Sequence, residues 1–208
     1  MCDSLSNREA CSFEDQSALA RLRILALWID RSPQRRQKWK EMCKFLDLPD
    51  KFIEYDVDTR WNSTFRMLSD GLKARTQINK FLQLQSDLPM PCFSGSDWAR
   101  LQQIHDILSK FNELTLFISN RKPQISLTVP MYYELHELLE DASERSGKFS
   151  AIDKDNADAV KNGLRKYRKY YTFMDAINTY YTALILDPRV KGDLIQEELR
   201  DDDDSGRL

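Results

Sequence analysis

Glycine and proline are scarce in this chain of 208 residues, with six and seven copies respectively. A β-sandwich needs turn residues about every ten positions, so this scarcity argues against that fold and favours a chain built of helices. Long apolar runs are also missing. The longest, Ile24 to Ile29, covers six residues, whereas a membrane-spanning helix needs roughly 20. We therefore expect a helical chain with no membrane contact.

Motifs for metals and cofactors are missing as well. The four cysteines form no C-x-x-C pair and the chain has only two histidines, so we expect no zinc site. The sequence has no Ser/His/Asp or Cys/His arrangement and no glycine-rich phosphate loop, and it predicts neither a metal nor a cofactor. Its net charge of -2 does not by itself indicate a nucleic-acid binder.

Apolar residues recur every three or four positions over most of the chain, a spacing that is typical of amphipathic helices. It predicts helices over about 18–29, 33–46, 60–83, 96–118, from 128 onward, and over 153–186 with a break near 171–172. Ser32 and Ser96 are expected to cap the second and fourth of these, and Pro33 fits a first helical position. Gly71 should weaken the third helix by about 1 kcal/mol relative to alanine.

One segment departs from this pattern. "KFIEYDV", residues 51–57, is rich in β-forming residues and predicts a single short strand. A lone strand cannot satisfy its own backbone hydrogen bonds. Either it pairs with another copy, or it is not a strand, or its sheet lies in sequence that this chain lacks.

Two carboxylates, Asp56 and Asp58, stand at the end of that segment. On a strand their spacing would place both on one face, where two acids could bind a divalent cation as in two-metal nucleases. The interpretation that we favour is that Asp58 or Thr59 caps a helix beginning at Arg60, because a side-chain oxygen there satisfies the unpaired amides of the first turn.

Two stretches combine basic and aromatic residues. The first carries Arg31, Arg35, Arg36, Lys38 and Lys40 around Trp39, and the second carries Lys161, Arg165, Lys166, Arg168 and Lys169 beside three tyrosines. Cations neutralise phosphates and aromatic rings stack on bases, so both stretches are candidate DNA-binding faces. Each is also explained as a solvated helix face beside a buried stripe, with Trp39 in register with Met42 and Leu46.

Several segments, taken in order, carry a family resemblance. They are "RSPQRRQKWK", "DVDTRWNSTFRMLSDGLKAR", "WARLQQIHDILSKFNELTLFIS", "ISLTVPMYYELHELL", "LRKYRKYY" and "ALILDPRVK". In order and spacing they resemble the part of hAT-superfamily transposases, fungal members in particular, that leads from a ribonuclease-H-like core through a helical insertion. The resemblance runs from about residue 18 to residue 192, and "TRWNST" and "LDPR" are its most specific motifs.

The resemblance implies a transposase that cuts transposon-end DNA with an acidic triad and a divalent metal. In that family the first two acids precede the matched region and the third follows it, so we assign no catalytic residue and expect no enzyme activity from this chain alone. What it implies instead is a structural signature, made of Asp58, Thr59, Arg60, Trp61, Asn62, Ser63, Asp187, Pro188 and Arg189.

The expected fold is mainly α, a helical insertion region with one short strand that belongs to an incomplete ribonuclease-H-like (α/β) domain. The expected divisions are a disordered lead-in (1–17), a core remnant (18–59), the helical insertion region (60–192) and an acidic disordered tail (193–208).

The expected function is that of a truncated hAT transposase-like protein with residual DNA binding, in the nucleus as the family implies. The DNA contacts would come from Arg35, Arg36, Lys38, Lys40, Arg165, Lys166, Arg168 and Lys169. The alternative is a protein-interaction module that assembles with full-length hAT relatives and binds no DNA.

Overall fold

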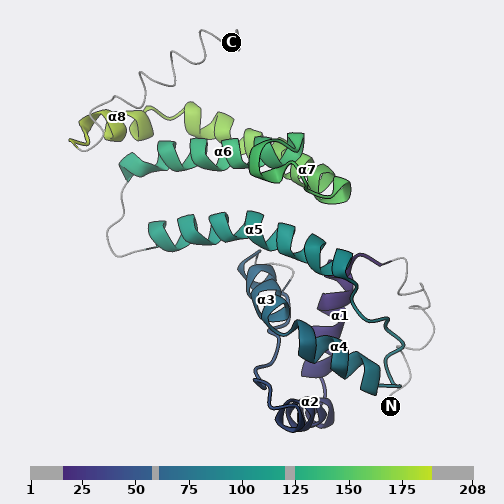
Figure 1. The fold of residues 1–208 in the computed structure, drawn as a ribbon. Helices are drawn as coiled ribbons and strands as arrows, with labels where there is room; N and C mark the ends of the chain where they lie inside the picture. The colour runs from purple at the N-terminus through teal and green to yellow at the C-terminus, as the bar shows by residue number, and fades with distance from the viewer. Residues whose placement is uncertain (1–15, 58–60, 120–124, 189–208) are drawn as a thin grey trace, which may run out of the picture. The chain divides into compact units, whose positions relative to one another are not determined.

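The computed structural model describes residues 16–57, 61–119 and 125–188, and every regular element in these ranges is helical (Figure 1). The prediction of a mainly α chain is confirmed. The predicted acidic tail lies outside the described residues, as does nearly all of the predicted lead-in. None of the described helices is both long and apolar enough to cross a membrane.

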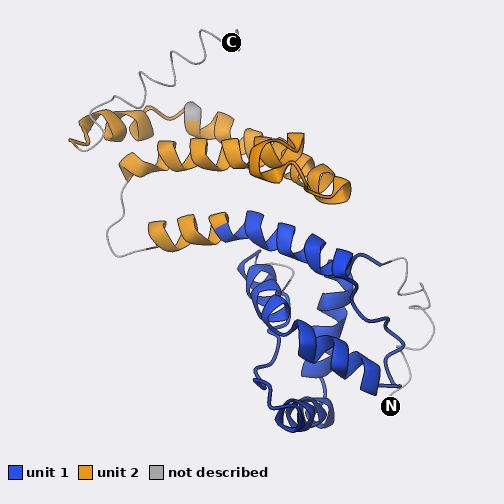
Figure 2. Cartoon of the chain, in the orientation of Figure 1, with its two compact units in different colours: residues 1–109 blue, residues 110–208 orange. Residues whose placement is uncertain are grey.

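The chain forms two compact units, residues 1–109 and 110–208, which are described separately (Figure 2). The elements are α1 (Ala18–Asp30), α2 (Pro33–Phe45), α3 (Trp61–Lys73), α4 (Arg75–Leu84), α5 (Gly95–Ile118), η2 (Ile125–Leu127), α6 (Thr128–Glu144), η3 (Gly147–Phe149), α7 (Lys154–Asp175) and α8 (Asn178–Leu186). Helix α5 begins in the first unit and ends in the second.

Helix α1 provides the central apolar surface of the first unit. Leu22 and Leu25 on this helix are fully buried, and α1 contacts both α2 and α3. The turn into α2 is as predicted, because the Ser32 hydroxyl accepts a hydrogen bond from the amide of Arg35 at 3.4 Å and Pro33 occupies the first turn. Local sequence chemistry therefore fixes where α1 gives way to α2.

The side chain of Trp39 belongs to the core. Its ring packs edge-on against Phe81 of α4 with the ring centroids 5.3 Å apart, and both side chains are fully buried. Burying an aromatic side chain of this size contributes about 1.5–3 kcal/mol. No face of the Trp39 ring is exposed to stack on a base, so the stacking interpretation of this residue is wrong.

The single helix predicted over 60–83 is also wrong, because α3 and α4 are separate helices that meet at Ala74. The amide of Ala74 donates to the carbonyl oxygens of both Asp70, at 2.9 Å, and Gly71, at 3.2 Å, in a tight turn. The bend brings α4 against α2, where Phe81 meets its aromatic partner. Tertiary packing, and not a proline or glycine at the junction, decides this boundary.

The predicted strand at 51–57 is wrong as well, since no described residue pairs with it as a strand. Its backbone instead bonds to side chains of α3. The amide of Glu54 donates to the Asp70 carboxylate at 3.4 Å, and the amide of Val57 donates to the Ser63 hydroxyl at 2.8 Å. β-Forming residues favour an extended backbone in a half-buried position. In this segment side chains of α3, and not a neighbouring strand, accept the backbone hydrogen bonds.

Helix α5 starts earlier than the sequence predicts, and Ser94, not Ser96, occupies the capping position. The Ser94 hydroxyl accepts from the amide of Asp97 at 3.1 Å, and the Asp97 carboxylate accepts from the amide of Ser94 at 2.8 Å. This reciprocal pair is a capping box with aspartate in the third position.

The second unit is built on α6 and α7, which pack against each other (Figures 1 and 2). Helix α6 begins at Thr128, as predicted. Its core with α7 and α8 consists of Val129, Met174 and Leu184, surrounded by Tyr132, Tyr133, Tyr171, Tyr180 and Tyr181. The break predicted near 171–172 lies instead at 176–177, because Tyr171 and Met174 continue the stripe of α7 that faces this core.

Replacing two helical glycines by alanine should change the stability of the chain in opposite directions. A Cβ at Gly71 would lie 2.9 Å from a terminal carbon of Leu22, which is fully buried, whereas a Cβ at Gly163 would meet nothing within 4 Å. Gly163→Ala should stabilise the chain by about 1 kcal/mol. Gly71→Ala should destabilise it by roughly 1 kcal/mol, because overpacking costs about 1–3 kcal/mol and the helix gains only about 1.

Urea unfolding measures both changes. Tryptophan fluorescence reports Gly71→Ala, because all four tryptophans lie in the first unit, and far-ultraviolet circular dichroism reports Gly163→Ala. A more stable Gly71→Ala variant would show that Leu22 moves aside without cost and would contradict the prediction.

Candidate nucleic-acid interface

Helix α7 has one side fixed by the core of the second unit. Leu164 is buried, and the hydroxyl of Tyr167 donates to the carbonyl oxygen of Tyr132 on α6 at 2.8 Å. Burial, with smaller effects from the hydroxyls of Tyr132 and Tyr171, raises the pKa of Tyr167 far above its usual value. Tyr167 therefore remains a protonated donor, and this contact sets the rotation of α7.

The opposite side of α7 carries its cations. Arg165, Lys166 and Lys169 are exposed, and within the described ranges none of the three has an ion-pair or hydrogen-bond partner. Arg168 differs, because its guanidinium binds the Glu140 carboxylate of α6 at 2.7 Å. Of the four cations predicted here, three are thus available to an external anion.

The arginines predicted on α2 are engaged within the chain. The Arg35 guanidinium lies over the Trp28 ring, 3.9 Å from its centroid, and donates to the Trp28 carbonyl oxygen at 3.0 Å. Arg36 donates to the Asp30 carbonyl oxygen at 2.9 Å and lies 3.3 Å from its carboxylate. Both arginines hold the turn between α1 and α2.

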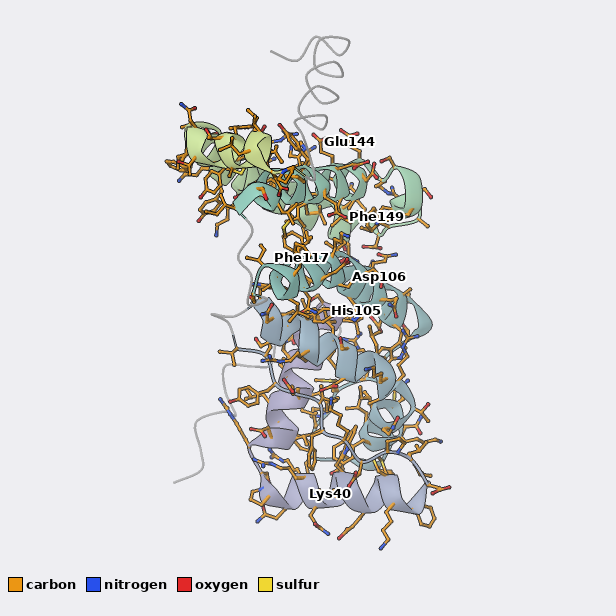
Figure 3. The ribbon with its side chains drawn as sticks, turned by 90° about the vertical axis from the view of Figure 1, so that its left-hand side faces the viewer. Lys40, His105, Asp106, Phe117, Glu144 and Phe149 are labelled. Atoms are coloured by element: carbon orange, nitrogen blue, oxygen red, sulfur yellow. The ribbon has the colours of Figure 1, made fainter. Side chains whose placement is uncertain are left out.

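Lys38 and Lys40, the two lysines predicted as DNA contacts on α2, make weaker interactions than the arginines. The ammonium of Lys38 lies 3.9 Å from the Asp87 carboxylate, and that of Lys40 lies 5.4 Å from the centre of the Phe52 ring (Figure 3). Both residues are exposed. The α2 face therefore offers two weakly engaged cations, fewer than α7.

The acid considered as a metal ligand, Asp56, is instead a buried tether. Its carboxylate accepts from the hydroxyls of Ser63 at 2.7 Å and Thr64 at 2.9 Å, and it pairs with the Arg23 guanidinium at 2.5 Å. Burial raises the pKa of Asp56, but these three donors outweigh it and hold the pKa below its usual value. Asp58 lies outside the described residues. Among the residues that the structure does describe, no group of three potential metal ligands occurs.

The predicted structural signature is only partly described, because Asp58, Thr59, Arg60 and Arg189 lie outside the described residues. Trp61 is the first residue of α3, Asn62 is half-buried and Ser63 is buried. At the other end, the carboxylate of Asp187 is buried and accepts from the Ser126 hydroxyl at 2.6 Å, while Pro188 is exposed.

Sequence reasoning missed a buried ion pair and two exposed rings. Arg21 pairs with Asp97 at 2.7 Å, linking α1 to the start of α5, with only 7% of the Arg21 side chain exposed. The signal was present, since Arg21 precedes the buried Leu25 by four residues, within the apolar face of α1. Tyr170 and Phe173 on α7 are exposed, and the sequence pattern alone did not separate them from the buried rings of the same helix.

The second unit also has a cavity of about 310 Å³ at the end of α5. It is lined by Lys110, Glu113, Leu114, Phe117, Leu127, Pro130, Met131 and Glu134 (Phe117 is labelled in Figure 3). Lys110 crosses its rim to bind the Glu134 carboxylate at 2.5 Å. The cavity is therefore apolar inside, with a neutralised cation at its edge.

Comparison with known proteins supports the resemblance to a family. The ZBED1 RNase-like helical domain matches residues 13–107, a stretch that ends close to the boundary of the first unit. A maize protein, "Putative AC transposase", is 27% identical over 187 residues, which are 86% of this chain and 21% of the relative. The chain is similar to hAT-family transposases.

Two further relatives agree with that assignment. Human "Zinc finger BED domain-containing protein 4" is 24% identical over 183 residues, 88% of the transposase-like chain and 15% of the relative. "Putative transcriptional regulator tpeD" of Talaromyces stipitatus is 30% identical over 141 residues, 64% of the chain and 16% of the relative. The chain thus spans about a fifth or less of the curated relatives that it matches. No solved structure matches it.

The resemblance to hAT transposases expected from the motifs is confirmed. The fungal type, the domain boundaries at 17, 59 and 192, and the roles of the predicted site residues stay predictions.

Replacing Asp56 by asparagine tests the tether. Asp56→Asn keeps the shape but removes the charge and one acceptor, so the first unit should lose about 1–3 kcal/mol of unfolding free energy at pH 7. The folded pKa lies below the ordinary 3.8, so the wild-type advantage is complete above that value and disappears as the pH falls through the folded pKa. The difference between the two proteins should therefore be constant from about pH 7 to 5 and shrink below about pH 4.

Urea unfolding followed by tryptophan fluorescence at several pH values measures this difference. Asp87→Asn is the matched control, because the Asp87 side chain is exposed and its nearest cation is 3.9 Å away. An Asp56→Asn protein as stable as the wild type at pH 7 would show that Asp56 is not a tether.

Proposed function

We propose that this transposase-like chain contacts DNA phosphates through the outward face of α7 and does not cut DNA by itself. The observation that carries the proposal is the group of three exposed cations, Arg165, Lys166 and Lys169, for which the described residues provide no acidic partner. Three positive charges on one helix face are an electrostatic footprint for phosphates. A relative named as a transposase supports DNA as the polyanion and the nucleus as the place of action.

The absence of cleavage is proposed on the chemistry of Asp56. A carboxylate that already accepts from two hydroxyls and a guanidinium has little capacity left for a divalent cation. The cations of α2 are proposed as a secondary contact, limited to Lys38 and Lys40, because Arg35 and Arg36 hold the preceding turn.

A salt titration tests the DNA contact. For duplex DNA, the slope of log affinity against log salt should flatten by about 2.7 in Arg165→Gln/Lys166→Gln/Lys169→Gln, because each lost phosphate contact removes about 0.9. Fluorescence anisotropy with a labelled duplex measures the slope. The matched control, Lys44→Gln/Lys73→Gln/Lys80→Gln, removes three exposed lysines of the first unit and the same charge. Equal slopes in these two variants would refute a localised α7 contact.

The second candidate, an assembly module for full-length hAT relatives, is favoured by one observation. Leu116 and Ile118 at the end of α5 are exposed beside the cavity that Phe117 lines. An apolar interface would resist about 1 M salt, whereas phosphate binding would not. Under this function, sedimentation velocity in high salt should show association that Leu116→Asn/Ile118→Asn removes and the control Leu84→Asn leaves intact. A chain that stays monomeric in the presence of a relative excludes it.

A further inference from the structure

The basic face of α7 continues into two exposed aromatic rings. Tyr170 is 56% exposed and Phe173 is 63% exposed. The other tyrosines of this helix, Tyr167 and Tyr171, face inward, where their rings contact Tyr132 of α6. The core is thus complete without Tyr170 and Phe173, and these two rings are left to the solvent.

Helical spacing places these rings among the cations. Residues three or four apart on a helix are neighbours, with about 5–6 Å between their Cβ atoms. Lys169 follows Lys166 by three residues and Phe173 follows Lys169 by four, while Tyr170 follows Lys166 by four. Each ring therefore has a lysine within one turn, on a side of α7 that the core does not cover.

A helix face on which cations alternate with aromatic rings should interact differently with duplex DNA and with unpaired DNA. In a duplex the base faces are stacked on each other, so a protein that binds only the phosphates there gains no stacking energy from exposed rings. In unpaired DNA each base has an open π-face that stacks on an aromatic side chain, while the phosphates follow a positively charged surface. The α2 face lacks this combination, because Trp39 is buried and the Trp28 ring is covered by Arg35. The exposed Phe45 at the end of α2 follows Glu41 by four residues and Met42 by three, so it has no cation at a neighbouring helical position.

We propose that the outward face of α7 binds unpaired nucleotides, with phosphates on Arg165, Lys166 and Lys169 and bases stacked on Tyr170 and Phe173. This inference rests on the proposed DNA contact and specifies its substrate as single-stranded or locally opened DNA.

Paired binding measurements test it. Tyr170→Leu/Phe173→Leu retains apolar helix-forming side chains but removes both rings. Its affinity for a single-stranded oligonucleotide should fall by about fivefold or more, the loss expected from one or two stacked bases. Its affinity for a duplex of the same length should change by less than about twofold, because the phosphate contacts remain.

Two further measurements separate stacking from general effects. The control Phe45→Leu/Tyr55→Leu removes one exposed phenylalanine and one exposed tyrosine from the first unit and should leave both affinities unchanged. A single strand containing 2-aminopurine should change its fluorescence on binding the wild type and not on binding Tyr170→Leu/Phe173→Leu. Circular dichroism verifies that both variants remain folded.

The outcomes distinguish the two proposals. If wild type binds neither form of DNA, the proposed function fails. If it binds both forms and the ring variant loses nothing on the single strand, the DNA contact stands and the stacking inference is overturned. A ring variant that weakens self-association in sedimentation velocity, with unchanged DNA affinity, would make this face a protein interface and would also overturn the inference.

Discussion

Buried carboxylates hold the first unit together in the place where the sequence predicts a single strand. Asp56 binds the end of the extended segment 51–57 to α1 and α3, through Arg23, Ser63 and Thr64. Asp70 of α3 accepts from the Lys51 ammonium at 2.5 Å and from a backbone amide of the same segment. A carboxylate has about four acceptor sites, so one side chain can satisfy donors from several elements.

A third carboxylate extends the same principle to the end of the unit. Asp97 caps α5 with Ser94 and pairs with the buried Arg21 of α1. Burial raises the pKa of Asp97, but the donors from Arg21 and Ser94 outweigh it and lower the pKa, as at Asp56. The packing of α1, α3 and α5 in this unit therefore depends on ionised Asp56 and Asp97, and protonation of these two acids at low pH removes both tethers.

The two basic helices show how packing separates residues of the same type. On α2 the arginines are used to close a turn, because Trp28 and Asp30 lie just before it and offer carbonyl, ring and carboxylate partners. On α7 an inward-facing Tyr167 turns Lys166 and Lys169 toward the solvent. A cation count would rank the two stretches equally, whereas the proposed binding face is the one with three cations, Arg165, Lys166 and Lys169, that have no acidic partner among the described residues.

The sequence by itself determined the helical class, the cap at Ser32, the start of α6 at Thr128 and the family resemblance, because these depend on local spacing and short ordered motifs. It did not determine the break at Ala74, the absence of a strand at 51–57, or the exposure of Tyr170 and Phe173. Those features depend on contacts between residues far apart in the chain, such as Trp39 with Phe81 and Glu54 with Asp70. A periodic sequence pattern shows which residues share a helix face. Only tertiary packing determines which of those faces are buried.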